Sequence, residues 1–382
     1  MKIALVHDYL NEFGGAERVL LALSEIWSEA PIYTAFVKKG SPAYERFKNK
    51  KIVTSWAQKV PGFNKYLFSP LRFLAPLIWN SFSSRLADYD VILASSGWYV
   101  TKGFKRGDKW DKSNKGNNRQ IEICYCHTPP RWLYGYKTSI EWQRFWPIRI
   151  YGQVMAHFMR LYDFNAAQRV DYFIANSKEV QARIKKFYKR DSTVIYPPVD
   201  LPKSQKSKRK GYYLVVSRIV GAKGLSLAIE AANKLGIKLK IAGFPAGYQT
   251  EYKNLLEKSD SNIEFLGYVS DEELTSLYEG AKAFLALAKD EDFGITPVEA
   301  MSFGTPVVAY YGGGYKETVI DGKTGVFFKD YSVEGLIEAI SKLDRIKIKS
   351  EDCLKQAEKF NIRRFQKEIQ KFVEEKMNDT RK

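Results

Sequence analysis

The chain has 382 residues, of which 45% are hydrophobic and 27% charged. This length exceeds the ~100–200 residues of one domain, and the composition excludes a disordered or membrane-spanning chain, so we expect two globular domains. Three cysteines are too few for a disulfide framework, and the net charge of +18 implies an anionic partner, for which nucleic acid and an anionic membrane surface both qualify.

The N-terminal residues do not resemble a signal peptide. Ile3 to Val6 are the only apolar run before His7 and Asp8, which is far short of a signal-peptide core. The most apolar long stretch, Tyr66 to Phe82, contains Arg72 and two prolines, whereas a membrane span needs about 20 mainly apolar residues. We therefore expect a cytoplasmic protein without a transmembrane segment.

Short apolar runs alternate with helical patterns through the first half of the chain. The runs are KIALVHDY, PIYTAFV, KIVTS, DVILASS, IEICYCH, DYFIANS and TVIYPPV. Nearly continuous apolar strands are typical of a parallel sheet that is covered on both faces by helices. We therefore predict a doubly wound, Rossmann-like domain over residues 1–198, whose first helix runs from Ala16 to about Trp27.

A second domain of the same kind is predicted after a linker. The lysine- and serine-rich segment LPKSQKSKRKG follows Pro198 without hydrophobic periodicity and is the best candidate for that linker. The alternation then restarts with a helix from Gly224 to Leu235 and the strands YYLVVSR, KLKIAG, IEFLG, AFLALA, PVVAY and GVFF. This predicts a domain over 199–358. A final amphipathic helix within 359–382 is predicted by apolar residues at three- to four-residue spacing, namely Ile362, Phe365, Ile369 and Phe372.

The most distinctive stretch, KDEDFGITPVEAMSFGTPVVAYYGGGYKETVIDG, follows the predicted strand AFLALA. Ligands of open parallel sheets bind beyond the carboxyl ends of the strands. A helix is expected from about Ile295, with Glu291 in the loop before it and Glu299 on its second turn. The helix N-terminus favours a phosphate, because it offers unpaired N–H groups and the positive end of the dipole. Both carboxylates can then face one ligand.

These residues resemble the donor-site signature of family 4 glycosyltransferases. The matching positions are Glu291-Asp292-Phe293-Gly294, Glu299-Ala300, Gly304 to Val307, Gly312-Gly313 through Glu317, Asp321 to Gly325, Ser217-Arg218, Lys223-Gly224 and Gly14 to Glu17. The resemblance implies an α/β protein of the GT-B fold, with two facing Rossmann-like domains and a C-terminal helix that crosses back to the first. The segments similar to the branch with bacterial O-antigen mannosyltransferases are His127 to Arg131 and Phe173 to Ser177 with Tyr196 to Asp200.

The resemblance also implies roles for single residues of a retaining, metal-independent enzyme without a cofactor. Glu299 would bind the ribose hydroxyls of a nucleotide-sugar donor, and Glu291 the hydroxyls of its sugar. Arg218 and Lys223 would hold the diphosphate and stabilise the charge of the leaving group. His127 would lie over the sugar. The other donor-binding positions implied are Gly14, Gly15, Phe293, Gly294, Ile295 and Thr296.

Four other interpretations of the sequence are weaker. Cys124, Cys126 and His127 could suggest a metal site, but alternating cysteines on an apolar strand without a second pair predict core packing. The Asp-x-Asp motif of metal-dependent glycosyltransferases occurs twice, at Asp290 to Asp292 and at Asp88 to Asp90. The resemblance to family 4 implies that neither binds a metal ion. A dinucleotide oxidoreductase would have a Gly-x-Gly-x-x-Gly turn after the first strand, and a nucleic-acid-binding protein would have a recognition motif; the sequence has neither.

The donor and the acceptor are the least determined. We expect GDP-mannose from the mannosyltransferase resemblance, with a UDP-sugar as the alternative, and either a glycan or a polyprenyl-linked glycan as the acceptor. The segment Trp56 to Phe82 combines Lys59, Lys65 and Arg72 with the apolar residues Tyr66, Phe68, Phe73, Leu77 and Trp79. This pattern predicts peripheral, salt-sensitive binding to the inner face of the cell membrane. The alternative is that these residues pack on the sheet as an ordinary helical layer.

Overall fold

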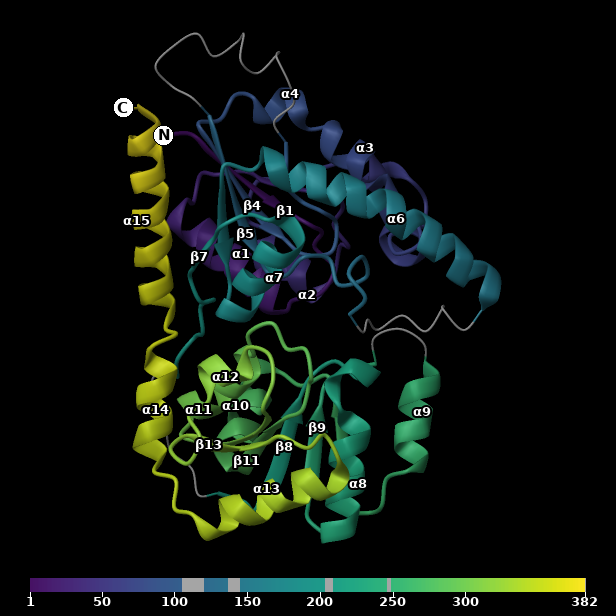
Figure 1. Ribbon diagram of the computed structural model, residues 1–382, viewed down its shortest axis with the longest axis vertical. Coiled ribbons are helices and arrows are strands. Elements are labelled where there is room, and N and C mark those ends of the chain that lie inside the picture. Colours follow the sequence, from purple (N-terminus) through teal and green to yellow (C-terminus); the bar gives the residue numbers. More distant parts are fainter. Residues whose placement is uncertain (105–119, 137–144, 203–208, 246–248, 382) are drawn as a thin grey trace. The chain divides into compact units, whose positions relative to one another are not determined.

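The computed structural model describes residues 1–104, 120–136, 145–202, 209–245 and 249–381. The chain forms two compact units, each built around its own parallel sheet (Figure 1). Unit 1 comprises Met1–Tyr136, Pro147–Pro198 and Arg363–Lys382, and unit 2 comprises Lys137–Trp146 and Val199–Ile362. The central part of the predicted linker, residues 203–208, lies outside the described residues.

The sheet of unit 1 has seven strands in the order β3-β2-β1-β4-β5-β6-β7, and every pairing is parallel. The central strands are buried along their whole length because both faces of the sheet are covered. The strands are β1(Ile3–His7), β2(Ile32–Thr34), β3(Ile52–Thr54), β4(Val91–Ser96), β5(Ile121–Cys126), β6(Tyr172–Ala175) and β7(Thr193–Val194).

Helices of unit 1 follow the strands and pack apolar faces on the sheet. The final helix buries Phe365 and Ile369, and the ring of Phe365 lies edge-on to Tyr125 of β5 at 5.9 Å. The helices are α1(Gly15–Ile26), α2(Pro42–Phe47), α3(Ala75–Asn80), α4(Ser83–Leu86), α6(Trp146–Arg169), α7(Lys178–Tyr188) and α15(Ile362–Arg381). Between β3 and α3 the chain forms 3-10 turns at Trp56–Lys59 and Arg72–Leu74 and a π-helical turn at Phe63–Leu67.

Unit 2 repeats this architecture with six parallel strands in the order β10-β9-β8-β11-β12-β13. The strands are β8(Tyr212–Val216), β9(Leu239–Ala242), β10(Ile263–Gly267), β11(Ala281–Ala286), β12(Val307–Tyr310) and β13(Gly325–Phe328). The helices are α8(Leu225–Leu235), α9(Gln249–Glu257), α10(Asp271–Gly280), α11(Ile295–Ser302), α12(Tyr315–Thr318), α13(Val333–Arg345) and α14(Ser350–Glu358). A 3-10 turn at Gly221–Lys223 precedes α8.

In both sheets the strand order reverses beside the first strand of the unit, between β1 and β4 and between β8 and β11. A ligand crevice of a doubly wound sheet lies at such a switch point, beyond the carboxyl ends of the strands. The loops that leave β1 and β4 in unit 1, and β8 and β11 in unit 2, are therefore the places to look for a site. The predicted fold class, two doubly wound parallel sheets, is confirmed.

Candidate active site

Lys223 and Glu291 meet at the switch point of unit 2. Lys223 lies on the turn that follows β8, and Glu291 lies on the loop that follows β11, the strand paired with β8. The Nζ atom of Lys223 is 2.7 Å from Oε2 of Glu291, and the two side chains are 28% and 17% exposed. The structure thus pairs the cation expected to hold a diphosphate with the carboxylate expected to hold sugar hydroxyls. Both remain partly accessible to a ligand.

The backbone of Glu291 is held by the glycine-rich turn after β12. The N–H of Gly314 donates to the backbone oxygen of Glu291 at 2.8 Å. Gly313 has a φ of 52°, and a Cβ at this position would overlap the same oxygen. Tyr315 follows the turn with its hydroxyl 3.4 Å from Oε2 of Glu291, and burial together with that carboxylate raises the pKa of Tyr315 well above its ordinary value. The turn therefore fixes the loop that carries Glu291.

Glu299 lies on α11, where it is 6% exposed and accepts a 2.8 Å hydrogen bond from the hydroxyl of Tyr278. Gly294 precedes the helix in the left-handed region, with a φ of 91°. The side chain of Phe293 points into the core, where its ring lies 5.3 Å from that of Phe360. The half-buried Ile295 and Thr296 form the first turn of α11, whose N–H groups have no partner within the helix.

Arg218 is exposed on the loop after β8. The chain then turns into α8 through Gly224, which has a φ of 72°; a Cβ here would lie 2.9 Å from Leu287. This close packing of the turn against the end of β11 keeps Lys223 near Glu291.

His127 belongs to a chain of polar groups at the switch point of unit 1. The Oγ atom of Ser95 lies 2.7 Å from Nε2 of His127 and 3.0 Å from Nδ1 of His7. The Nε2 atom of His7 is 3.4 Å from Oε1 of Glu17. Burial, and to a smaller extent the neighbouring His7, lower the pKa of His127 to about 3. His127 is therefore a neutral hydrogen-bonding group at physiological pH.

Asp8 organises the loop that leaves β4. Its carboxylate accepts from the backbone N–H groups of Gly97 and Trp98, at 3.1 and 2.5 Å, and from the hydroxyl of Thr101. A Cβ on Gly97 would lie 4.0 Å from the Cβ of His127, so this loop borders His127. No role was predicted for Asp8, although its place directly after the first strand is a signal that the sequence contains.

Gly14 and Gly15 form the start of α1. The N–H of Gly14 donates to Oε2 of Glu17 at 2.9 Å and is therefore already used within the chain, while Gly15 is the first residue of the helix. Glu17 thus joins the start of α1 to His7. The sequence indicates Glu17 as part of the family signature but not its contact with His7, which depends on how α1 packs, nor the contact of His7 with Ser95, which depends on the pairing of β1 with β4.

The surface predicted from Trp56 to Phe82 needs correction at two residues. Trp79 is 2% exposed and its indole N–H donates to the backbone oxygen of Tyr99. Arg72 is buried too, donates to Ser69, and lies over the rings of two tryptophans, Trp98 at 5.5 Å and Trp132 at 5.1 Å. The expectation that these two side chains face a membrane is wrong, because this part of the segment packs as an inner layer.

Other residues of that segment are at the surface. Tyr66 and Leu77 are 78% and 58% exposed, Lys59 and Lys65 are exposed, and Phe68 and Phe73 are half-buried.

Cys124 and Cys126 are buried in the core of unit 1 as free thiols. Of the helices in the part of the chain that the structure describes, none has the length and apolar character needed to cross a membrane.

Two families of known proteins match this chain, one over each half. The family described as Glycosyltransferase Family 4 matches residues 13–203, and the family described as Glycosyl transferases group 1 matches residues 198–360. The alpha-1,3/1,6-mannosyltransferase ALG2 of Kluyveromyces lactis is 26% identical over 84% of this chain and 71% of its own length. The glycogen synthase of Thermus caldophilus is 31% identical over 44% of this chain, and the match spans 36% of that enzyme.

Solved structures share the whole architecture. The Anabaena protein Alr3699/HepE in complex with UDP and glucose has a TM-score of 0.72 at 18% identity and covers 98% of this chain and 99% of its own. The sucrose-phosphate synthase of Thermosynechococcus elongatus has a TM-score of 0.74 at 15% identity, covering 99% of this chain and 100% of its own. At these identities the likeness concerns the fold, which is GT-B.

Proposed function

The chain belongs to glycosyltransferase family 4, and on that basis we propose that it transfers mannose from GDP-mannose to a glycan or lipid-linked glycan acceptor. The observation that carries the proposal is the pair of Lys223 and Glu291 at the switch point of unit 2, within the donor signature of the family. Such a pair offers a cation to a diphosphate and carboxylate oxygens to sugar hydroxyls within one site.

Mannose is favoured because the relative ALG2 is named a mannosyltransferase and matches 84% of the chain. The segment that begins at His127 adds a resemblance to the O-antigen mannosyltransferase branch. A UDP-sugar is the alternative donor, since the structural neighbour Alr3699/HepE is in complex with UDP and glucose.

In the proposed reaction Arg218 and Lys223 stabilise the charge that builds on the leaving diphosphate, together with the N-terminus of α11. The same Lys223 pairs with Glu291, so donor binding would exchange one anionic partner of the ammonium for another and release Glu291 toward the sugar hydroxyls. Glu299 would hold the ribose. Transfer would proceed with retention of the anomeric configuration, without a metal ion and without a protein nucleophile.

The acceptor side of the proposal lies in unit 1. His127 of the same unit would lie over the donor sugar, and because it is neutral it can both donate a hydrogen bond to a sugar hydroxyl and accept one from it. A polyprenyl-linked acceptor would place the protein on the anionic inner face of the cell membrane, which fits the net charge of +18.

The test is a panel of nucleotide sugars offered to the purified protein with a lipid-linked glycan extract. GDP-mannose should be consumed and yield an α-linked product by NMR, with equal rates in the presence of excess EDTA. Consumption of a UDP-sugar alone would replace the donor assignment, a β-linked product would refute retention, and loss of activity in EDTA that magnesium restores would refute metal independence. If the protein consumed no nucleotide sugar, the proposed function would be wrong.

A further inference from the structure

The helix α6 is apolar on two opposite faces. Its inner face packs on the core of unit 1 through the buried residues Ala156, Met159, Asp163, Ala166 and Ala167. Successive residues are about 100° apart around a helix, so the large apolar side chains between positions 151 and 161 that are 40–61% exposed lie on the side opposite this inner face. They are Tyr151 at 40%, Val154 at 45%, Phe158 at 61% and Leu161 at 55%. We call these four residues the outer face of α6.

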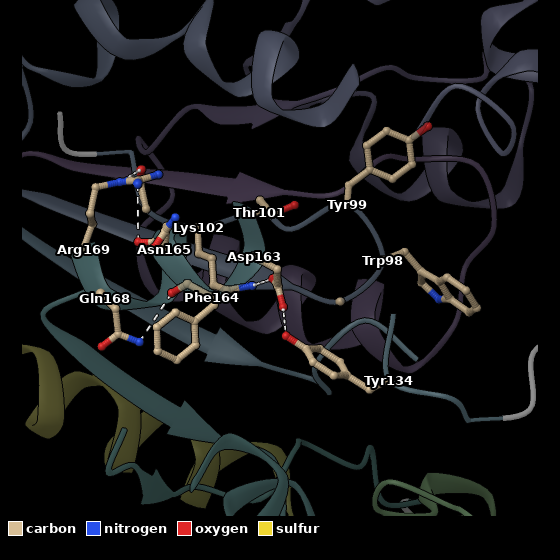
Figure 2. A network of polar contacts seen from close by, with 12 residues as sticks. Trp98, Tyr99, Thr101, Lys102, Tyr134, Asp163, Phe164, Asn165, Gln168 and Arg169 are labelled. Atoms are coloured by element: carbon tan, nitrogen blue, oxygen red, sulfur yellow. Dashed lines mark hydrogen bonds and ion pairs between the residues drawn. The ribbon is translucent and has the colours of Figure 1, made fainter. Parts of the chain in front are cut away.

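The orientation of α6 is fixed from its inner side. Asp163 forms a buried ion pair with Lys102 and accepts a 2.7 Å hydrogen bond from the hydroxyl of Tyr134 (Figure 2). Arg160 donates to the backbone oxygen of Leu133 at 3.1 Å. A rotation that buried Phe158 would expose this ion pair, and breaking a buried pair is strongly destabilising. The outer face is therefore held outward by the fold.

The outer face continues into the segment between β3 and α3. Tyr151 donates its hydroxyl to the backbone oxygen of Pro70, and its ring lies 6.3 Å from that of Phe73. That segment in turn exposes Tyr66, and the helix α3 that follows it exposes Leu77. Helix α6 runs beside α3 in the view of Figure 1. A surface with this many large apolar groups is typical of a site that contacts a partner or a membrane.

The charges around this surface select the partner. Residues 147–169 contain one acidic side chain, the buried Asp163, and residues 56–82 contain none. The exposed cations Lys59 and Lys65 are in the second of these segments, and Lys65 directly precedes the exposed Tyr66. An anionic bilayer attracts such a surface, whereas a second copy of a chain with a net charge of +18 would bring the same cations against it.

We propose that the outer face of α6 is the element that seats this protein on an anionic bilayer, with its aromatic and aliphatic groups at the boundary between headgroups and acyl chains. The proposal rests on the proposed function, in which the acceptor is carried on a lipid. The proposed membrane contact is also connected with the polar groups at the switch point of unit 1. Lys102 directly follows Thr101, whose hydroxyl donates a hydrogen bond to Asp8. The ion pair of Lys102 with Asp163 thus ties the seated helix to the loop that borders His127.

The experiment is cosedimentation of the full-length protein with vesicles of phosphatidylglycerol and phosphatidylcholine in equal parts, and with vesicles of phosphatidylcholine alone, across a salt series. Wild type should bind the anionic vesicles at low salt, and the double variant F158S/L161S should bind them at least about tenfold more weakly. The matched control is L256S/Y268S, which removes two side chains that are 43% and 70% exposed in unit 2. This control should bind as wild type does.

Equal vesicle binding by F158S/L161S and wild type would overturn the proposal. So would a wild-type dimer that this variant abolishes in sedimentation equilibrium, because the face would then serve self-association. Titration calorimetry with nucleotide sugars separates this inference from the proposed function. If the protein binds a nucleotide sugar but no vesicles, only the membrane proposal is wrong. If it binds vesicles but no nucleotide sugar, the proposed function is wrong.

Discussion

At the scale of single residues, the pairing of Lys223 with Glu291 makes the charge of Glu291 the first feature to remove. Glu291→Gln keeps the volume of the side chain but loses its charge and part of its capacity to accept hydrogen bonds. We expect it to abolish most sugar transfer and to leave the thermal unfolding midpoint within a few degrees, because the amide oxygen of glutamine can still accept a hydrogen bond from Lys223. The measurement is the initial rate of transfer at saturating donor.

The control for this substitution is Glu334→Gln, which removes an exposed ion pair with Lys234 in the same unit. It should transfer sugar at the wild-type rate. A wild-type rate in Glu291→Gln would remove Glu291 from the site.

Glu299 is expected to act on binding. Glu299→Ala leaves the ribose hydroxyls without their carboxylate and the hydroxyl of Tyr278 without its acceptor, so donor affinity should fall by ~1–3 kcal/mol. Titration calorimetry with the donor measures this directly. Tyr278→Phe removes the hydroxyl alone and should weaken donor binding much less. Unchanged affinity in Glu299→Ala would place the ribose elsewhere.

The lowered pKa of His127 predicts a pH dependence of stability. In the unfolded chain this histidine takes up a proton near pH 6.5, but in the folded protein it does so only near pH 3. Between these values the unfolded state binds more protons, so the free energy of unfolding decreases as the pH falls. Lowering the pH from 7 to 5 should cost about 2 kcal/mol through His127 alone.

Urea unfolding at pH 7 and pH 5 tests this dependence. The loss of stability between the two should be smaller by about that amount in His127→Gln, whereas His157→Gln, at an exposed position, should behave as wild type does. The same loss in all three proteins would contradict the burial of a neutral His127.

At the scale of secondary-structure elements, the glycine-rich turn after β12 should matter through the loop that it supports. Gly313→Ala places a Cβ against the backbone oxygen of Glu291 and forces a left-handed φ on alanine, so the loop must move. We expect a loss of unfolding free energy of ~1–3 kcal/mol together with a loss of transfer of at least about tenfold.

Gly322→Ala separates the two effects. Gly322 has a φ of 71°, but a Cβ there has no heavy atom within 4 Å. This variant should therefore show the backbone strain without the loss of transfer. If both variants transferred sugar at the wild-type rate, the turn would not be what positions Glu291.

The elements also show where sequence reasoning succeeds. The strands were predictable because each is a short, nearly continuous apolar run, and α15 was predictable because one side of it is apolar. Helix α6 was not predicted, since apolar residues on both of its faces hide the helical period. Arg72 and Trp79 were placed at the surface in error, because a mixed run of cations and aromatic residues does not reveal which side chains point inward.

For the site, the sequence indicated single residues but not the contacts between them. The resemblance named Glu291 and Lys223, but their contact depends on the pairing of β8 with β11, and the two residues are 68 positions apart. The chain of His7, Ser95 and His127 likewise depends on the alignment of β1, β4 and β5. Local patterns do not contain such neighbourhoods, which arise from the order of strands in the sheet.

At the scale of the whole molecule, each of the two units presents polar groups at the switch point of its own sheet. Unit 2 presents a cation and two carboxylates, and unit 1 presents a neutral histidine beside a buried aspartate. Under the proposed function, unit 2 would hold the diphosphate of the donor, and the neutral His127 of unit 1 would exchange hydrogen bonds with hydroxyls of the sugar. The excess of positive charge fits a reaction in which donor and membrane are both anionic.

The most direct test of the central claim is the transfer of radiolabel from GDP-mannose into the lipid fraction of a membrane extract, measured for wild type and Glu291→Gln side by side. We expect label in the lipid fraction with wild type and almost none with the variant at equal protein concentration. The proposed function would be contradicted if neither protein transferred label, whether from GDP-mannose or from any UDP-sugar. The role of Glu291 would be contradicted if both proteins transferred label equally.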